Sequence, residues 1–344
     1  MLWLTWIDDK LCIAKPERVQ TEKEEIKKHF QCDDVGAVKD YIGCKTEINT
    51  EERYVKFTQP VLVQSLSDEF EDIPQGASPM TPAKPGTILT KCEESEKLDE
   101  KQHSRYRTGV GKLLYLAKHS RPDIANAVRE LARHTHAPSS AHWHAMCWCI
   151  RYVRATPDRG LLLKPSGIWD GKDKSFKFTI RGRSDSNYAT DPESRRSVTG
   201  TVVYLNDAPI MFGSVTQKHV TLSVTEAELA AVASVVQDMM YVYRVVTSME
   251  LQVQLPMVVE MDNSGARDLA NSWSVGGRTR HVDVRMFFLR ELKEDGLIVF
   301  KHIAGTENET DIFTKNVDAA TLHRHTKCYC GDDEAYESLK GNKA

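Results

Sequence analysis

Long hydrophobic runs are missing from this sequence. In 344 residues, no apolar stretch approaches the roughly 18 residues of a membrane span. The first residues are apolar, but they lack the basic segment and the small-residue cleavage site of a secretory signal peptide. We therefore expect no membrane among the partners of this protein.

Cysteine is also scarce, and neither sign of charge dominates. The eight cysteines are scattered along the chain, which indicates reduced thiols in a reducing compartment and argues against a disulfide framework. The formal net charge is only −3, so binding to nucleic acid would have to depend on local basic patches or bound metal ions. What remains is an ordinary globular composition, with 40% hydrophobic and 28% charged residues.

The chain opens with MLWLTWIDDKLCIA, in which the adjacent carboxylates of Asp8 and Asp9 stand between apolar runs. Residues 2–7 and 10–14 predict the two strands of a hairpin. Adjacent carboxylates repel each other, and their burial is costly unless a cation or hydrogen bonds compensate. With further helical and strand-like segments behind the hairpin, residues 1–76 are expected to form a compact α+β unit.

Two segments of different character follow. Residues 77–103 lie in a stretch rich in Pro, Gly and charge, which predicts a linker. Residues 104–165 predict a small helical bundle, in which Pro122 and Pro138 lie near the first turns of new helices. This region is locally basic, so a solvated helical surface and contact with phosphates both remain open. Its basic residues include Arg105, Arg107, Lys112, Lys118, Arg121, Arg129 and Arg133.

Residues 176–316 have the pattern of an α/β domain. Three strand-like runs are followed by a long helix that begins near residue 224, and strands and helices then alternate. This order predicts a mixed sheet with helices packed on it. We expect residues 317–344 to be a weakly ordered tail, because the spacing of its histidines and cysteines fits no common zinc finger.

Carboxylates in this α/β region fall at positions where sites are built. Asp185 and Asp262 end predicted strands, and Asp311 opens a predicted helix. Several carboxylates that converge on one spot cannot all be ionised without a partner. Hard divalent cations with oxygen ligands provide that partner, and Mg²⁺ is the usual choice where phosphates complete the shell.

Helix geometry separates a fourth acid, Glu228, from its neighbour Glu226. The run Ser223-x-x-Glu226 fits a capping box, in which Glu226 reaches back to the backbone N–H of Ser223. Residues two apart on a helix point about 200° apart, so only one of the pair can face a shared site. Glu228 is therefore the site candidate, and Thr306-x-x-Glu309 fits a second capping box beside Asp311.

The motifs RSDSNYATDPESRRSVTGTVVYL, LSVTEAELAAV, MDNSGA, RTRHVDVRMFFLRE and ENETDIFTK resemble, in order and spacing, the ribonuclease H domain of copia-type retrotransposon polyproteins. The helical segment is similar to the segment that precedes this domain in the family. WIDD resembles the Y-x-D-D-type signature of the reverse transcriptase palm. The resemblance runs from about residue 3 to about residue 316, with gaps in the linker.

The resemblance implies a ribonuclease H-like mixed five-stranded sheet, preceded by a partial palm and a helical thumb or connection region. It implies Mg²⁺-dependent endonucleolytic hydrolysis of RNA in RNA–DNA hybrids, with two Mg²⁺ ions for which Mn²⁺ can substitute. The metal ligands carried over are Asp185, Glu228, Asp262 and Asp311. His302 resembles a mobile histidine that assists proton transfer or product release, although its spacing to Asp311 differs from that of the family.

The sequence departs from the family pattern beside the first ligand. Asn187-Tyr188 replaces the usual Asp-Trp, and Ser264 stands where glutamine is common. Neither change removes a metal ligand. Asn187 removes one negative charge beside the site, which would weaken metal binding.

Asp8 and Asp9 resemble the paired aspartates of a polymerase hairpin, which hold catalytic Mg²⁺. A polymerase site also needs an aspartate from an upstream strand and the fingers, so we expect no primer extension by this chain alone. Retained metal binding at Asp8 and Asp9 and an uncompensated acidic turn stay open as alternatives. The missing N-terminal part of the polyprotein is an expected partner, in a longer precursor or as a second chain.

An RNA–DNA hybrid would be recognised by shape and 2′-hydroxyls rather than by base sequence. Five arginines are candidate contacts to its backbone, with solvated surface charge as the alternative: Arg195, Arg196, Arg278, Arg280 and Arg285. The competing interpretation of the chain is a catalytically inactive, decayed remnant that at most binds nucleic acid. The resemblance implies an intracellular protein, located in the cytoplasm within a virus-like particle and in the nucleus.

Overall fold

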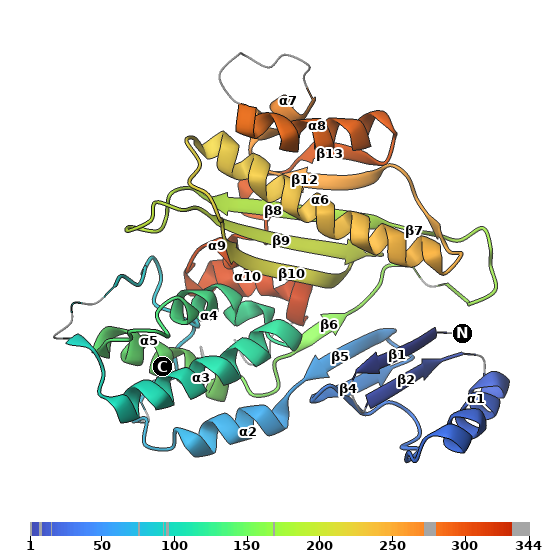
Figure 1. The fold of residues 1–344 in the computed structure, drawn as a ribbon, viewed down its shortest axis with the longest axis horizontal. Helices are drawn as coiled ribbons and strands as arrows, with labels where there is room; N and C mark the ends of the chain where they lie inside the picture. The colour runs from blue at the N-terminus through green and yellow to red at the C-terminus, as the bar shows by residue number, and fades with distance from the viewer. Residues whose placement is uncertain are drawn as a thin grey trace.

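A five-stranded mixed sheet forms the centre of the C-terminal half (Figure 1). The computed structural model describes residues 2–6, 9–14, 16–74, 76–91, 93, 96–167, 169–271 and 280–331. The strand order is β10-β9-β8-β12-β13, in which β10, β9 and β8 are antiparallel neighbours and β12 is parallel to β8 and β13. The strands are β8 (Ile180–Asn187), β9 (Val198–Leu205), β10 (Ala208–Thr216), β12 (Met257–Met261) and β13 (Ile298–His302). The expected mixed α/β sheet with flanking helices is confirmed.

One face of this sheet is covered by α6 (Val224–Ser248), with α7 (Ser264–Asn271) and α8 (Arg280–Glu294) beside it (Figure 1). The long helix packs directly on β8 because Gly182 has no side chain. A Cβ atom at Gly182 would lie 2.4 Å from the Sδ atom of Met239, which is far inside van der Waals contact. The glycine therefore sets how closely α6 approaches the strand that carries Asp185.

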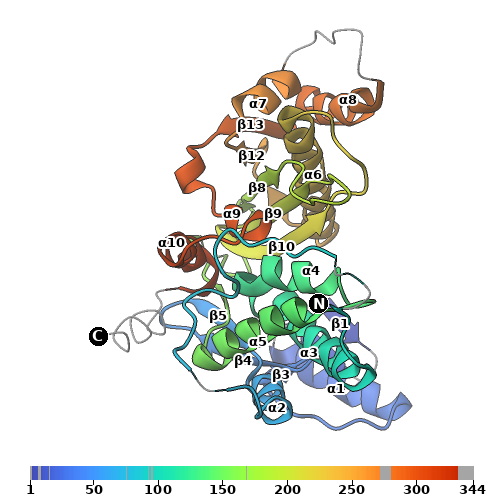
Figure 2. The ribbon, with the colours of Figure 1, turned by 90° about the vertical axis from the view of Figure 1, so that its left-hand side faces the viewer.

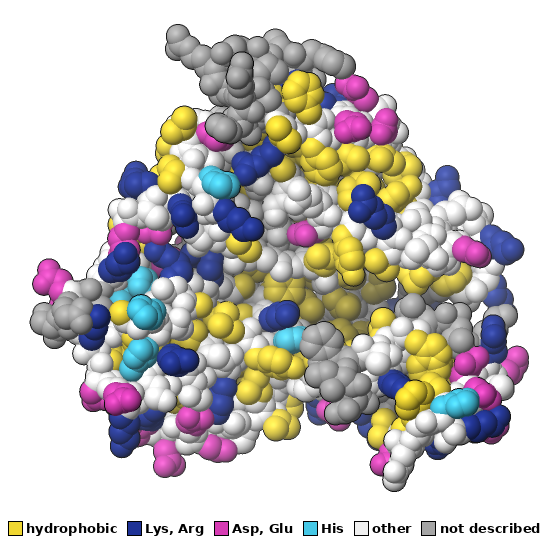
Figure 3. Space-filling view, viewed as in Figure 1, with side chains coloured by type: hydrophobic (Ala, Val, Ile, Leu, Met, Phe, Trp, Pro, Cys, Tyr) yellow, Lys and Arg dark blue, Asp and Glu magenta, His cyan; other side chains and the backbone are white. Residues whose placement is uncertain are grey.

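Helix α6 is long and rich in apolar residues. Of the helices that the structure describes, α6 is long and apolar enough to cross a membrane by length and composition. The sequence pattern predicted no run of this kind. The inner face of α6 includes the fully buried Val232, Val235 and Met239. Figure 3 shows hydrophobic side chains on the outer surface in the region of this helix, and Tyr241 and Val245 are exposed. Packing against the sheet accounts for the apolar inner face.

The opposite face of the sheet is covered by α4, α9 and α10 (Figure 2). Tyr204 of β9, Phe313 of α9 and Tyr329 of α10 belong to the same buried cluster as the helical bundle. The bundle and the sheet therefore share one hydrophobic core. The elements on this side are α2 (Pro60–Glu69), α3 (Glu100–His119), η2 (Pro122–Ile124), α4 (Ala125–Ala132), α5 (Ser140–Ala155), η3 (Gly305–Glu307), α9 (Asp311–Thr314) and α10 (Ala319–Cys330).

Helix α10 corrects the expectation of a weakly ordered tail for residues 319–330. Asp318 caps the helix, since its carboxylate accepts hydrogen bonds from the backbone N–H groups of Ala320 and Thr321. Leu322 and Tyr329 are buried in the shared core. The apolar residues recur at helical spacing, but His, Arg and Lys between them obscure the pattern in the sequence.

The N-terminal residues form two small sheets. The predicted hairpin is present, with β1 (Leu2–Trp6) antiparallel to β2 (Asp9–Ile13), and α1 (Pro16–His29) follows it. The second sheet has the order β3-β4-β5-β6, and its last strand comes from beyond the helical bundle. Its strands are β3 (Asp40–Tyr41), β4 (Cys44–Asn49), β5 (Tyr54–Thr58) and β6 (Leu161–Leu163). A short parallel pair, β7 (Lys177–Phe178) and β11 (Gln252–Val253), completes the described strands.

Several basic residues of the helical region have partners inside the protein. Arg121 is 1% exposed and forms a bidentate pair with Asp123. Arg129 pairs with Glu130. Arg133 Nη2 lies 2.7 Å from Asp191 Oδ2, which ties the bundle to the β8–β9 loop. For these arginines the structure favours an internal ionic role over contact with phosphates.

Candidate metal centre

Three carboxylates converge at the end of β8. Asp185 lies in β8, Glu228 in the first turns of α6, and Asp262 directly after β12. Each offers one carboxylate oxygen, and these three oxygens lie within 4.8 Å of one another. Asp185 and Glu228 are buried, and Asp262 is partly exposed. The structure thus brings together three of the four metal ligands predicted from the sequence.

The topology explains this meeting. Strands β8 and β12 are parallel neighbours, so their C-terminal ends lie at the same edge of the sheet. Asp185 pairs across the ladder with Gly200 of β9. A Cβ atom at Gly200 would lie 2.8 Å from the carbonyl oxygen of Thr310, so the glycine lets the start of α9 approach β8. The same approach brings Asp311 to the site.

The electrostatics of the cluster are unfavourable without a cation. Burial, with the charges of Asp185 and Asp262, raises the pKa of Glu228 to about 8. Burial and the charge of Asp185 raise the pKa of Asp262. The pKa of Asp185 is also raised, mainly by burial, although Lys315 opposes the shift. Each shift reflects the cost of holding negative charge in this place.

Lys315 is a charged neighbour of the cluster that the sequence analysis did not single out. Its Nζ lies 2.8 Å from Asp311 Oδ1 and 3.5 Å from Asp185 Oδ2, and Thr314 Oγ1 donates a hydrogen bond to Asp185. Asp311 also raises the pKa of Asp185 through its charge and a side-chain hydrogen bond, so Asp311 adjoins the cluster directly as well as through the ammonium group of Lys315. The four-residue spacing between Asp311, which begins α9, and Lys315, which follows the end of α9, was a visible signal for this ion pair.

Replacement of Lys315 by an uncharged residue should increase the repulsion between the carboxylates of Asp185 and Asp311. We expect Lys315→Met to lower the free energy of unfolding of the metal-free protein by about 1 kcal/mol, a small value because the side chain is 40% exposed. It should also enlarge the gain in melting temperature on adding Mg²⁺, since a more negative site binds a cation more strongly. Thermal melts in EDTA and in Mg²⁺ measure both effects. Lys118→Met on α3 is the matched control, and equal behaviour of the two variants would contradict the role of Lys315.

The two predicted capping boxes have different outcomes. Ser223 caps α6 by accepting from the backbone N–H of Glu226, as predicted, but the Glu226 carboxylate accepts from the backbone N–H of Leu222 rather than Ser223. Glu226 stays outside the carboxylate cluster. The second box is absent, because the Glu309 carboxylate accepts from Arg183 and Tyr204 instead. The Glu309 carboxylate thus bonds to side chains of the sheet and does not cap the helix next to it.

The remaining candidates lie at varied distances from the cluster. His302 ends β13, is exposed, and one ring nitrogen lies 3.0 Å from the carbonyl oxygen of Asp262, so the structure places it beside the site. Arg195 and Arg196 are exposed in the loop that follows β8. Arg285 lies in α8, on the α6 side of the sheet.

Asp8 and Arg278 lie outside the described residues, and the same holds for the side chain of Arg280. Asp9 begins β2, opposite Trp6, and is exposed. Neither the N-terminal hairpin nor these arginines add a described group to the carboxylate cluster.

The donor set fits a hard divalent cation. All three clustered groups are carboxylates, which are the ligands that Mg²⁺ and Mn²⁺ prefer. Glu228 Oε1 accepts a hydrogen bond from the backbone N–H of Ser186 at 3.3 Å. Its Oε2 is buried and has no hydrogen-bond partner among the described residues. An unpartnered buried carboxylate oxygen is costly, and a cation would satisfy it.

Comparisons with known proteins identify several relatives of this chain. No family model matches the chain. The chain is 29% identical over 322 residues to the retrovirus-related Pol polyprotein from transposon TNT 1-94 of Nicotiana tabacum, which covers 92% of this chain and 23% of that protein. It is 31% identical over 224 residues to the retrovirus-related Pol polyprotein from transposon RE2 of Arabidopsis thaliana, which covers 65% of this chain and 15% of that protein. Among solved structures, the ribonuclease H1 named LC11, isolated from compost, matches 48% of this chain and 99% of its own, with 13% identity and a TM-score of 0.31.

The chain is therefore similar, over most of its length, to retrovirus-related Pol polyproteins from plant transposons. It spans less than a quarter of the length of these two relatives.

Proposed function

We propose that residues 176–316 form a copia-type ribonuclease H domain that hydrolyses RNA endonucleolytically in RNA–DNA hybrids with Mg²⁺, and that this domain follows a segment of reverse transcriptase. The observation that carries the proposal is the convergence of Asp185, Glu228 and Asp262, with oxygens within 4.8 Å of one another. A buried acidic cluster of this kind is unstable alone and fits a metal-dependent phosphoryl transfer site.

The cluster would hold the metal ions through Asp185, Glu228 and Asp262, with Asp311 next to them. Bound Mg²⁺ ions would supply charge stabilisation for the attacking water and the departing 3′-oxygen. The products would be a 5′-phosphate and a 3′-hydroxyl.

Residues around the cluster would transfer protons, contact the substrate backbone and balance charge. His302 is exposed beside Asp262, where its imidazole can exchange a proton with the leaving product and with water. Arg195 and Arg196 are exposed in the loop after β8, on the edge of the sheet where the hybrid backbone would lie. Lys315 holds Asp311 next to Asp185 and balances part of the negative charge.

Cleavage of a labelled RNA–DNA hybrid tests the proposal. The purified protein should cut the RNA strand internally in millimolar Mg²⁺ and should not cut it in EDTA. Single-stranded RNA and duplex DNA of the same sequence are the controls. Folded protein that leaves the hybrid intact in both Mg²⁺ and Mn²⁺ would favour the alternative, an inactive remnant that at most binds nucleic acid.

A further inference from the structure

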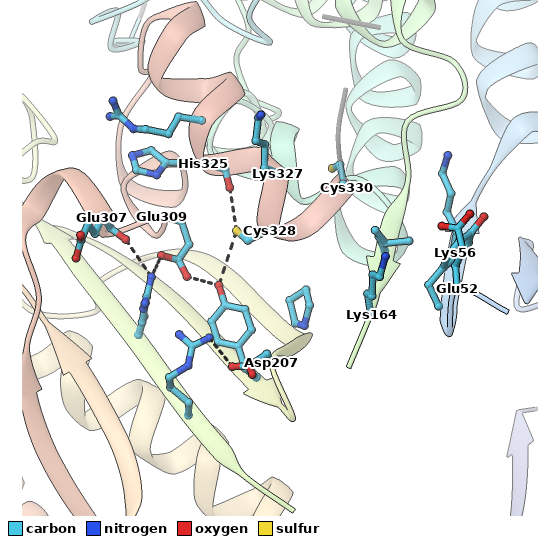
Figure 4. A pocket seen from close by; sticks show the side chains of 18 of the residues that line it. Glu52, Lys56, Lys164, Asp207, Glu307, Glu309, His325, Lys327, Cys328 and Cys330 are labelled. Carbon is cyan, nitrogen blue, oxygen red and sulfur yellow. Dashed lines mark hydrogen bonds and ion pairs between the residues drawn. The ribbon is translucent and has the colours of Figure 1, made fainter. Parts of the chain in front are cut away.

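A cavity of about 1000 Å³ lies apart from the carboxylate cluster, on the face of the sheet opposite α6 (Figure 4). Its walls come from four separate parts of the chain, of which the segment between β13 and α9 contributes Glu307 and Glu309. The N-terminal sheet contributes Lys56 and, just after β6, Lys164; the central sheet contributes Arg181 and Arg183; and α10 contributes Arg324 and other residues. The cavity therefore exists only because these parts pack together.

The described walls carry more positive than negative charge, with six Lys or Arg side chains against four Asp or Glu side chains. Arg181 and Arg183 are already paired with Glu260 and with other acids. Among the described residues, no hydrogen bond or ion pair joins Lys56, Lys164 or Arg324 to an acid. Two of these cations come from the N-terminal sheet and one from α10, and within the described part of the chain no acid pairs with them.

A buried polar atom on the same wall also lacks a partner. His325 is only 4% exposed, and its Nε2 atom makes no hydrogen bond within the described part of the chain. Figure 4 shows its ring on the α10 side of the cavity, across from Lys56 and Lys164. A buried nitrogen without a partner costs free energy, and a ligand oxygen or hydroxyl in the cavity would remove that cost.

We propose that this cavity binds the phosphodiester backbone of single-stranded nucleic acid. The cations lie at several separate positions. This arrangement suits a strand with repeated phosphates better than it suits a single compact anion. Lysines suit phosphates as point charges that do not read sequence, and the ring of Tyr54 on the wall can stack with a base.

The position links the cavity to the carboxylate cluster. Arg183 and Asp185 are two residues apart on β8 and point to the same face, so their backbones are separated by roughly 7 Å. A single strand in the cavity would therefore pass within about two nucleotides of the cluster. The binding itself does not require hydrolysis, so it goes beyond the proposed function.

Fluorescence anisotropy with labelled (dT)12 and (rU)12 tests the proposal in EDTA, where hydrolysis cannot occur. Lys56→Ala, Lys164→Ala and Arg324→Ala should each weaken binding about 3- to 10-fold. Each should also reduce the slope of log K against log salt by about 0.7, the value for one contact on a single strand. His325→Phe should weaken binding without changing that slope. Lys172→Ala, on an exposed loop, is the matched control.

Two results would overturn the proposal. One is binding by the three cavity variants that is no weaker than binding by Lys172→Ala. The other comes from uridine monophosphate: if it raises the melting temperature of the wild type but not of the variants, while oligonucleotide affinity is unchanged, the cavity holds a free phosphate ester instead. Oligonucleotide binding is measured in EDTA and hybrid cleavage in Mg²⁺, so wild-type protein that binds oligonucleotide but does not cleave the hybrid would contradict the hydrolysis proposal alone.

Discussion

Asp262→Asn is expected to abolish hydrolysis of the hybrid while it stabilises the metal-free protein. Loss of one charge-stabilising group in an active site lowers the rate by roughly 100- to 1000-fold. The same substitution removes a negative charge beside Asp185, whose charge raises the pKa of Asp262. We therefore expect the free energy of unfolding in EDTA to rise by about 1 kcal/mol, which is the stability cost of a charged site.

Thermal melts with and without Mg²⁺ complete this test. The wild type should gain stability in Mg²⁺ because the ion binds only the folded state, and Asp262→Asn should gain less. Asp295→Asn, an exposed acid after α8, is the control and should behave as the wild type. If millimolar Mg²⁺ leaves the wild-type melting temperature unchanged and Asp262→Asn is no more stable than its parent, the carboxylates do not form a metal site.

Glu228→Gln and Glu226→Gln should differ strongly, although the two residues are two positions apart on α6. Glu228 is buried in the cluster, so its amide variant should lose hydrolysis by a similar factor of about 100 or more. Glu226 contacts only the local backbone at the start of the helix, and glutamine can make the same hydrogen bond. Comparable loss of activity in both folded variants would show that the assignment of the pair is incorrect.

Glu228 should also give the metal-free protein an unusual pH dependence. Its pKa is about 8 in the folded state and near its ordinary value of about 4.5 in the unfolded chain. The folded state therefore holds the proton more tightly, so this contribution is fully present below pH 4.5 and is lost as pH rises through 8. The loss should be on the order of 3 kcal/mol.

The measurement is the melting temperature in EDTA between pH 5 and pH 9. The wild type should lose stability over this range relative to Glu228→Gln, which has no carboxylate to ionise, and Glu226→Gln should follow the wild type. Parallel curves for the wild type and Glu228→Gln would contradict the burial of this carboxylate among like charges.

Local patterns in the sequence were sufficient for much of the fold and the site. Periodicity and turn residues predicted the hairpin, the long helix α6 and the mixed sheet, because these signals depend on neighbours along the chain. Helix geometry separated Glu228 from Glu226, because side-chain direction on a helix follows from sequence spacing. The motif resemblance pointed to Asp185 and Asp262, which the structure brings together with Glu228.

Only the tertiary structure decided which distant groups meet. The sequence shows that Glu309 could cap a helix, but Arg183 and Tyr204 lie across the packed sheet and bind its carboxylate instead. Strand β6 completes the N-terminal sheet from beyond the bundle, and α10 buries Tyr329 in a core shared by bundle and sheet. The ammonium group of Lys315 between Asp185 and Asp311, and the cavity beside α10, likewise depend on contacts between separate segments. Such contacts are set by how whole surfaces pack, and no periodicity in one segment records the charge or shape of another.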